Sequence, residues 1–93
     1  LNPLVSVCVP AHNAQRHILA TLSALCNQNY PNYEIIIVND HSIDDTESII
    51  KNLKDSKIKL INNQNYGAAA ARNEALRNSN GELILFFDAD DLV

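Results

Sequence analysis

The sequence is short and mildly acidic: it has 93 residues, 46% of them hydrophobic, with 7 Lys and Arg against 11 Asp and Glu and a net charge of −4. This length predicts one small domain with a single core, and the negative charge excludes an extended basic surface for nucleic acid. No apolar run approaches the roughly 20 residues of a transmembrane helix, and no signal segment opens the chain. We therefore expect a cytoplasmic domain with no nucleic-acid partner and no transmembrane segment.

The cysteines and the two ends of the chain give further expectations. Cys8 in a strand-like run and Cys26 on a helical apolar stripe fit small buried hydrophobic side chains in a reducing compartment, not a disulfide or a metal site. The chain begins at Leu1 without Met and stops at Val93, directly after its most acidic segment. We expect residues 1–93 to be a fragment of a longer protein.

The first helix is expected between two buried strands. Leu4 to Val9 is an apolar, β-branched run that ends at Pro10, as is typical of a buried strand. Apolar residues then recur at helical spacing between Ala14 and Cys26, with Asn13 as the N-cap. Glu34 to Val38 repeats the buried-strand pattern.

Two more helices and two more strands follow in alternation. The second helix is expected to begin with a capping box formed by Asp44 and Glu47. The third strand is expected from Ile58 to Ile61, the third helix from Ala68 to Arg77 and the fourth strand from Glu82 to Phe87.

This alternation predicts a three-layer, doubly wound α/β fold with a parallel sheet of strand order 3-2-1-4. In such sheets, ligands bind beyond the carboxyl ends of the strands. The polar segments expected at this edge are residues 10–13, 39–42, 65–67 and 88–91. We therefore expect the functional site where these four segments meet.

The last of these segments carries closely spaced carboxylates. If the preceding apolar run is a strand, Asp88 and Asp90 point the same way, roughly 7 Å apart. Their repulsion costs roughly 2 to 3 kcal/mol at an effective dielectric of about 20, and a divalent cation would remove this cost. Oxygen ligands without nearby Cys or paired His favour Mg²⁺ or Mn²⁺. The alternative is a solvated acidic turn after a strand.

The glycine-rich loops that usually hold phosphates are absent. Gly67 and Gly81 are the only glycines, so neither GxGxxG nor GxxxxGK[S/T] is present. Phosphates would instead be held by a cation and by Arg72 with the start of its helix, although a surface salt bridge is the alternative role for Arg72. Asp40 would accept a hydrogen bond from a base or a ribose, or would simply turn its loop.

Four segments in a fixed order are more specific together than any one of them. They are Pro10-Ala11-His12-Asn13, Val38 to Ser42, Asn65 to Asn73 and Phe87 to Asp91. In this combination the chain resembles the family-2 glycosyltransferases along essentially its whole length. The resemblance implies the nucleotide-binding half of a GT-A, Rossmann-like fold, so that residues 1–93 would be the nucleotide-sugar-binding half of a transferase domain.

The resemblance also implies roles for individual residues. Asp40 would recognise the uracil ring, Arg72 would lie near the base and phosphates, and Asp88 would reach the ribose hydroxyls. Asp90, together with Asp88, would ligate the Mn²⁺ or Mg²⁺ that bridges the diphosphate, and Asp91 would assist them or cap the next element. The implied donor-binding residues are Pro10, Ala11, His12, Asn13, Asp40, Gly67, Arg72, Asp88 and Ala89.

Three positions differ from the family pattern. His12 stands where a Tyr often stacks on the base, His41 replaces the usual Gly, and Asn39 replaces the first member of an acidic pair. These differences concern the fit of the base, and therefore the identity of the nucleotide, more than they concern the family.

The implied activity is the inverting, metal-dependent transfer of a sugar from a nucleoside-diphosphate sugar, with UDP as the expected nucleotide, in polysaccharide biosynthesis. The acceptor would be a glycan or a lipid-linked sugar, which allows the full-length protein to act at the inner membrane surface. The general base is expected beyond Val93, so this chain would bind donor and metal but transfer no sugar. Its fourth strand would have an open edge that favours self-association.

Two other functions stay open. A phosphatase of the haloacid-dehalogenase type also has an apolar strand that ends in DxD, but that motif usually lies on the first strand. A nucleotide-binding or scaffold module without catalysis is the non-enzymatic alternative. Metal-dependent binding of UDP would favour a transferase, and phosphatase turnover would favour its rival.

Overall fold

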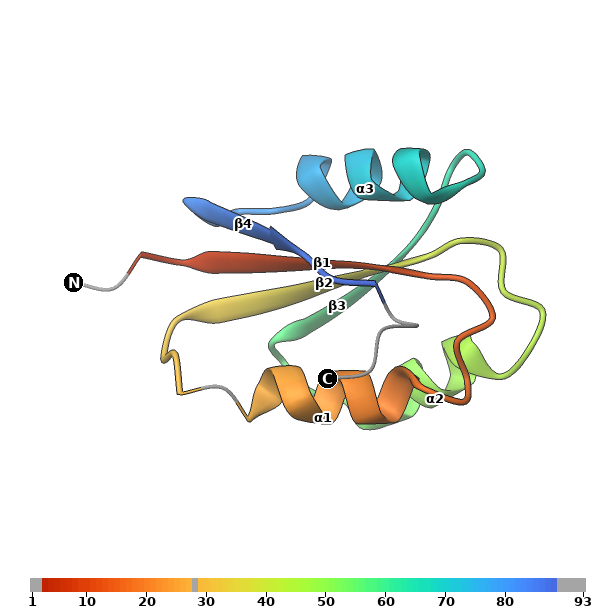
Figure 1. Ribbon diagram of the computed structural model, residues 1–93, viewed down its shortest axis with the longest axis horizontal. Coiled ribbons are helices and arrows are strands. Elements are labelled where there is room, and N and C mark those ends of the chain that lie inside the picture. The colour runs from red at the N-terminus through yellow and green to blue at the C-terminus, as the bar shows by residue number, and fades with distance from the viewer. Residues whose placement is uncertain (1–2, 28, 89–93) are drawn as a thin grey trace.

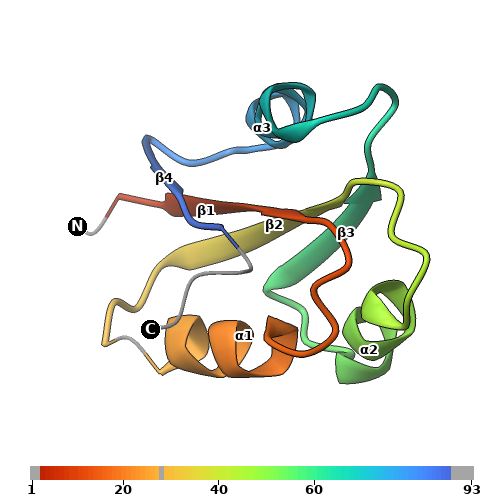
Figure 2. The same cartoon turned by 45° about the vertical axis from the view of Figure 1, so that its right-hand side comes forward.

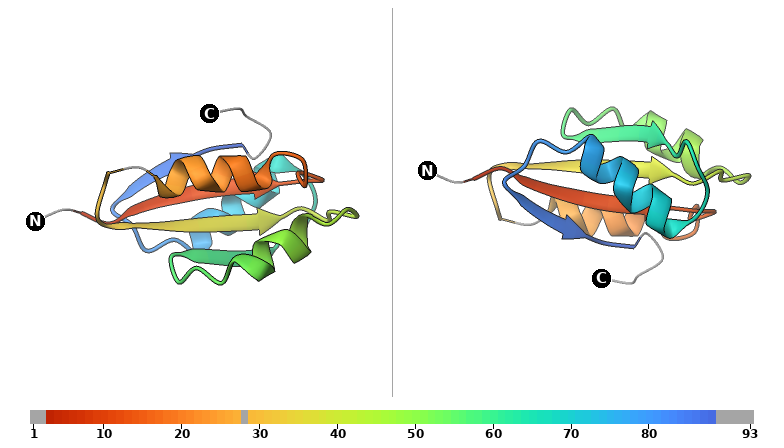
Figure 3. Two further views of the ribbon diagram at one scale, coloured as in Figure 1. Left: turned by 90° about the horizontal axis from the view of Figure 1, so that it is seen from below. Right: turned by 90° about the horizontal axis from the view of Figure 1, so that it is seen from above.

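Strands and helices alternate along the chain in the order β1 (Val5–Ala11), α1 (Ile18–Cys26), β2 (Tyr33–Asn39), α2 (Thr46–Leu53), β3 (Ile58–Asn62), α3 (Ala68–Arg77) and β4 (Leu83–Phe86). This computed structural model describes residues 3–27 and 29–88. The strands form one parallel sheet with the order β3-β2-β1-β4. Helices α1 and α2 cover one face of the sheet and α3 covers the other (Figures 1, 2 and 3). The predicted strand order and three-layer arrangement are confirmed.

A separate apolar layer fills each side of the sheet. On the α3 side, Ala71 and Ala75 have no exposed surface and pack with Ile36 and Val38 of β2. Their small side chains let α3 lie close to the strands. Because neighbouring residues of a strand face opposite sides, β2 is apolar along nearly its whole length. The larger layer, toward α1 and α2, contains Val5, Val7, Val9, Ile18, Leu22, Ile35, Ile37 and Ile50.

The predicted end of β1 at Pro10 is wrong, because the strand continues to Ala11. Pro10 pairs with Val38 of β2 in the parallel register, whereas the pairing of β1 with β4 stops at Cys8. The Cys8 carbonyl accepts from the Phe87 N–H at 2.9 Å, so the backbone of Cys8 bonds toward β4. Successive residues of a parallel strand bond to alternate neighbours, so the backbone of Pro10, two residues later, also faces β4. Proline has no N–H to donate to β4. This costs no ladder hydrogen bond here, because the regular pairing of β1 with β4 ends before Pro10.

Helix α1 begins at Ile18, four residues later than the sequence predicts, and Asn13 is not its N-cap. Asn13 instead adopts a left-handed backbone conformation, with φ of 48°. It donates its backbone N–H to Ser42 Oγ at 3.0 Å and accepts the Ile43 N–H on its side chain at 2.9 Å. These bonds to the loop after β2 replace the local capping bond, so tertiary contacts decide where the helix starts.

The predicted capping box of α2 is also wrong in its detail. Asp44 does accept the Thr46 backbone N–H at 3.0 Å, but the helix begins at Thr46 and Asp45 occupies the N-cap position. Glu47 lies 3.7 Å from Lys51 one turn later. Asp44 therefore stabilises the first turn from outside the helix. Desolvation opposes its ionisation, but its partners among the amides and the Thr46 hydroxyl lower its pKa.

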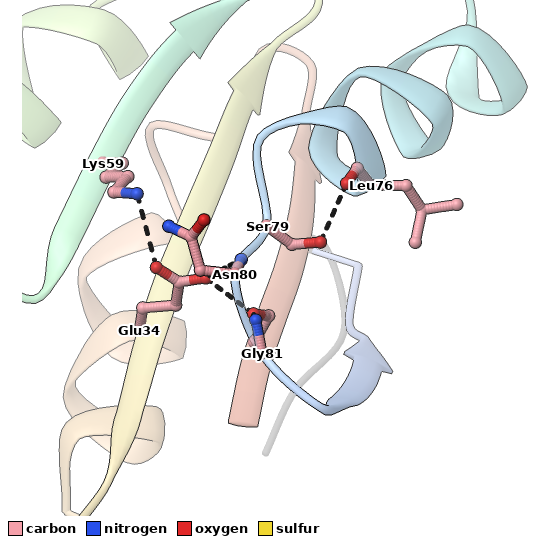
Figure 4. A network of polar contacts seen from close by, with 7 residues as sticks. Glu34, Lys59, Leu76, Ser79, Asn80 and Gly81 are labelled. Carbon is pink, nitrogen blue, oxygen red and sulfur yellow. Dashed lines mark hydrogen bonds and ion pairs between the residues drawn. The ribbon is translucent and has the colours of Figure 1, made fainter. Parts of the chain in front are cut away.

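Glu34 anchors the loop that leads into β4, at the edge opposite the carboxyl ends of the strands (Figure 4). Its carboxylate accepts hydrogen bonds from Ser6 Oγ at 2.6 Å and the Asn80 N–H at 2.7 Å, and lies 3.3 Å from Lys59 Nζ. Burial opposes ionisation, but these three partners lower the pKa of Glu34. Gly81 donates its N–H to the same Ser6 Oγ at 2.8 Å, and a Cβ at position 81 would lie 2.7 Å from Ser6 N. The start of β4 is thus fixed against β1.

Candidate functional site

A pocket of about 210 Å³ lies at the carboxyl ends of β1 and β2, beside the start of α3 and a residue that comes after β4. The topology predicts a ligand site here, because the strand order β3-β2-β1-β4 reverses between β1 and β4 and ligands bind at such a switch point. Six of the residues predicted to bind a nucleotide sugar gather there from segments far apart in the sequence. The lining residues are Pro10, Ala11, His12, Asp40, Ala68, Arg72 and Asp88.

The remaining predicted residues lie beside the pocket or outside the described part of the chain. Asn13 binds the loop after β2 and does not line the pocket. Gly67 does not line it either, but its N–H reaches the Asp40 carboxylate. Ala89, a predicted donor contact, and Asp90, one of the two predicted metal ligands, are outside the residues that the structure describes, as is Asp91.

Asp40 follows β2 directly and is held from several directions. Its backbone N–H donates to the Ala11 carbonyl at 2.8 Å, which extends the pairing of β1 with β2 by one step. Its Oδ1 accepts from Asn63 Nδ2 at 2.9 Å, and the Gly67 N–H lies 3.2 Å from both carboxylate oxygens. A carboxylate has about four acceptor positions. Asp40 therefore keeps acceptor capacity, mainly on Oδ2, for a ligand in the pocket.

His12 is fixed in one tautomer by its neighbours. Its Nδ1 lies 2.6 Å from the Asp40 backbone carbonyl, which can only accept, so Nδ1 carries the proton. Nε2 is then free to accept from Asn13 Nδ2, 3.4 Å away. The imidazole is exposed and lines the pocket as a planar ring, which suits stacking on a flat ligand.

Arg72 lies in the second turn of α3 and lines the pocket half-buried. Within residues 3–27 and 29–88 it forms no ion pair, and the nearby Glu74 instead pairs with Arg77. The alternative role in a salt bridge is therefore not found among the described residues. The first amides of α3, which have no partner within the helix, add positive potential on the same side.

Asp88 supplies an exposed carboxylate to this pocket. Among the described residues there is no group of three or more His, Cys, Asp or Glu side chains that could hold a metal ion. Two described carboxylates, Asp40 and Asp88, line the pocket, and no cysteine is among its described lining residues. Hard oxygen donors of this kind suit Mg²⁺ or Mn²⁺.

Sequence analysis missed two features beside the pocket. His41 stacks on Tyr66, with ring centroids 3.9 Å apart and 17° between the planes, and its Nε2 lies 2.7 Å from the Asn65 carbonyl. Its φ of 55° is left-handed, which agrees with the glycine that the family resemblance implies at this position. Asn63, which is only 3% exposed and does not line the pocket, donates a hydrogen bond from its side chain to the Asp40 carboxylate. Inside a run of similar polar residues, nothing in the sequence distinguishes the buried asparagine.

Comparison with known proteins identifies the family. Residues 6–93 match the family described as Glycosyl transferase family 2. This chain belongs to glycosyl transferase family 2. Its GT-A fold is equally clear from solved structures, as the predicted resemblance implied.

The family-2 chain is similar to three proteins whose names or structures include a nucleotide sugar. It is 49% identical, over 95% of its length, to the Escherichia coli UDP-Glc:alpha-D-GlcNAc-diphosphoundecaprenol beta-1,3-glucosyltransferase WfaP. Staphylococcus aureus TarS 1–349 in complex with UDP-GlcNAc superposes with a TM-score of 0.87 at 32% identity, over 95% of this chain and 27% of that one. The mannosyltransferase PcManGT from Pyrobaculum calidifontis, in complex with GDP-Man and Mn²⁺, gives 0.90 at 31% identity, over 99% of this chain and 29% of that one.

The family-2 chain is much shorter than these proteins. It spans 36% of the length of WfaP. In the part of the chain that the structure describes, no helix is long and apolar enough to cross a membrane.

Proposed function

We propose that the protein takes part in the inverting transfer of a sugar from a nucleoside-diphosphate sugar to an acceptor hydroxyl. One observation carries the proposal: in a chain of this family, His12, Asp40, Arg72 and Asp88 meet in a single pocket although they come from four separate segments. A planar ring, an acceptor, a cation and a carboxylate are the groups that a base, a ribose and a diphosphate require.

Each pocket residue has a role in holding the donor. Asp40 accepts an N–H of the base, and the His12 ring stacks on the face of that base. Arg72 and the first amides of α3 neutralise the phosphates. Asp88 reaches the ribose hydroxyls. The backbone of residues 10–13 forms the wall under the base.

Asp88 and Asp90 are the residues that would hold Mn²⁺ or Mg²⁺ against the diphosphate. When bound, such a cation supplies Lewis-acid stabilisation of the charge that develops on the departing nucleoside diphosphate. The Mn²⁺ present with GDP-Man in PcManGT supports this assignment.

UDP is the proposed nucleotide, and a glycan or lipid-linked sugar is the proposed acceptor. TarS with UDP-GlcNAc and the printed name of WfaP, which includes UDP-Glc and a diphosphoundecaprenol-linked sugar, support both assignments. With such an acceptor, the proposed reaction would belong to polysaccharide biosynthesis and would occur at the inner membrane surface.

Residues 1–93 are proposed to be the donor-binding half of a longer transferase. The general base that takes the acceptor proton is assigned beyond Val93, so these residues alone bind donor and metal without transferring sugar. The 36% coverage of WfaP supports this division.

Calorimetry with UDP, with and without Mn²⁺, tests the proposal in the longest natural polypeptide that contains these residues. We expect metal-dependent binding that is lost in Asp90→Ala. Arg72→Ala should weaken binding by about tenfold to a hundredfold, because a charge-assisted contact is worth about 1.5 to 3 kcal/mol. Arg77→Ala is the matched control, since Arg77 lies on the same helix and pairs with Glu74.

Other outcomes would redirect the assignment. If UDP does not bind with either cation, a scaffold module becomes the better description. Hydrolysis of phosphate esters with no sugar transfer would favour the haloacid-dehalogenase type of phosphatase instead.

A further inference from the structure

Asn63 is a buried polar residue whose side-chain amide donates two hydrogen bonds and accepts one. It follows β3 directly and is 3% exposed. Its Nδ2 donates to Asp40 Oδ1 at 2.9 Å and to the Gly67 carbonyl at 3.3 Å, while its Oδ1 accepts the Asn65 N–H at 3.2 Å. Its backbone N–H donates to the Asn39 carbonyl at 3.0 Å. One residue therefore connects the end of β2, the end of β3 and the turn into α3.

The bonds of Asn63 determine how Asp40 faces the pocket. Asn63 Nδ2 and the Gly67 N–H approach the Asp40 carboxylate from the β3 and α3 side, and both occupy positions on Oδ1. Oδ2 receives only the shared Gly67 N–H, also at 3.2 Å. Two neutral donors thus hold the carboxylate in one orientation without neutralising its charge. Acceptor positions on Oδ2 are left for a ligand.

We infer that Asn63 is a positioning residue for recognition of the donor's base: it holds Asp40 so that the carboxylate presents its free acceptor positions to an imide N–H such as that of uracil. The inference rests on the proposed function, because it assigns Asp40 a nucleotide to recognise. Asn63 itself does not line the pocket, so it acts through Asp40 and the Gly67 turn. Its effect should be on nucleotide discrimination more than on stability.

Two substitutions of Asn63 separate positioning from folding. Asn63→Ser shortens the side chain so that it no longer reaches Asp40, although a hydroxyl remains to bind the Asn65 N–H. Asn63→Asp keeps the shape but places a second carboxylate against Asp40. Two carboxylates in contact share one proton, and one pKa of the pair rises. At low pH the new carboxyl group donates a hydrogen bond as the amide did; at high pH it repels Asp40.

Asn62→Asp is the matched control. Asn62 is the exposed neighbour at the end of β3, and its Oδ1 accepts from Asn39 Nδ2 at 3.4 Å, a role that a carboxylate can keep. The change adds the same charge one residue away without touching Asp40. Among residues 3–27 and 29–88, the other titratable or charged groups that line the pocket are His12, Arg72 and Asp88, and His41 follows Asp40 directly. Because these are present in every variant, only a difference between pH profiles reports the new carboxylate.

The test is calorimetric binding of UDP and of CDP between pH 5 and 8 to the longest natural polypeptide that contains these residues, with circular dichroism to measure the fraction folded. Cytosine lacks the imide N–H, so wild type should prefer UDP. Asn63→Ser should lower UDP affinity about tenfold, the value of one ordinary hydrogen bond, and leave CDP affinity nearly unchanged. Asn63→Asp should bind UDP almost as wild type does at pH 5 and at least tenfold more weakly at pH 8. Asn62→Asp should follow wild type throughout.

The outcomes distinguish this inference from the proposed function. If wild type binds UDP and both Asn63 variants keep its affinity and its preference over CDP, the positioning role is wrong while the proposed function stands. A loss of affinity that only follows loss of folded protein would also overturn it. If wild type binds no UDP with Mn²⁺ or Mg²⁺, the proposed function fails, and the inference fails with it.

Discussion

At the scale of single residues, some polar side chains, such as Glu34 and Asn13, hold segments of the fold together, and others, such as His12 and Arg72, line the pocket. His12, Asp40 and Asp88 could be predicted to lie together because polar residues near the carboxyl ends of parallel strands meet at one edge. The place of Arg72 beside them was implied by the family resemblance. Asn63 could not be predicted in this way. Its neighbours in the sequence are equally polar, and only the tertiary fold decides which of them is buried against Asp40.

Glu34 gives a pH-dependent prediction. Because the folded protein lowers the pKa of Glu34 from its ordinary 4.5, the ionised form stabilises the fold above that pH. This stability is lost as pH falls through the lowered pKa. Glu34→Gln should reduce the free energy of unfolding by about 1 to 3 kcal/mol at pH 7, the usual cost of losing charged hydrogen bonds. The difference from wild type should shrink steadily below pH 4.5, which urea unfolding between pH 3 and 7 can measure.

Glu47→Gln is the control for this effect. Glu47 is more exposed and lies 3.7 Å from Lys51 on the surface of α2, so its loss should cost only about 0.3 to 0.5 kcal/mol. Equal costs for the two substitutions at pH 7 would show that the network around Glu34 adds nothing beyond a surface ion pair.

At the scale of elements, the type and order of every strand and helix could be predicted, but several boundaries could not. Apolar periodicity reports which face of an element is buried, and this is a local property. The start of α1 depends instead on bonds from Asn13 to a loop 29 and 30 residues away. The last residues of β1 depend on where a different strand stops, because Pro10 is tolerated only beyond the regular pairing with β4.

The close packing of α3 can be tested by enlarging one of its alanines. Ala75 has no exposed surface against the sheet, so Ala75→Leu should destabilise the protein by about 1 to 3 kcal/mol through overpacking. The same change should weaken UDP binding, because α3 carries Arg72 to the pocket. Urea unfolding and calorimetry measure the two effects. Ala69→Leu, on the exposed side of α3, should stay within about 0.5 kcal/mol of wild type.

At the scale of the whole molecule, the described sheet has one edge that is open and apolar. Leu83, Leu85 and Phe86 of β4 are 53%, 57% and 47% exposed, and β4 pairs on one side only, with β1. Sheet edges of this kind pair readily with another strand. This edge is the surface through which the self-association expected from the sequence would occur.

We predict that residues 1–93 on their own self-associate through β4 and that Leu85→Lys reduces this association, because an exposed lysine on an edge strand opposes pairing. Light scattering over a range of concentrations should show wild type above the monomer mass and the variant closer to it. Leu19→Lys is the control, since Leu19 is similarly exposed, at 51%, but lies on α1. A wild-type chain that stays monomeric at high concentration would contradict the prediction.

The residues that line the pocket come from segments far apart in the sequence. Pro10 belongs to the first strand and Asp88 comes after the last, so a molecule seated between them would bridge the beginning and the end of the folded unit. Occupancy should therefore raise the melting temperature of the entire domain as a single cooperative transition, not of one loop. Warming the protein with candidate nucleotides would then report on ligands before any acceptor is identified.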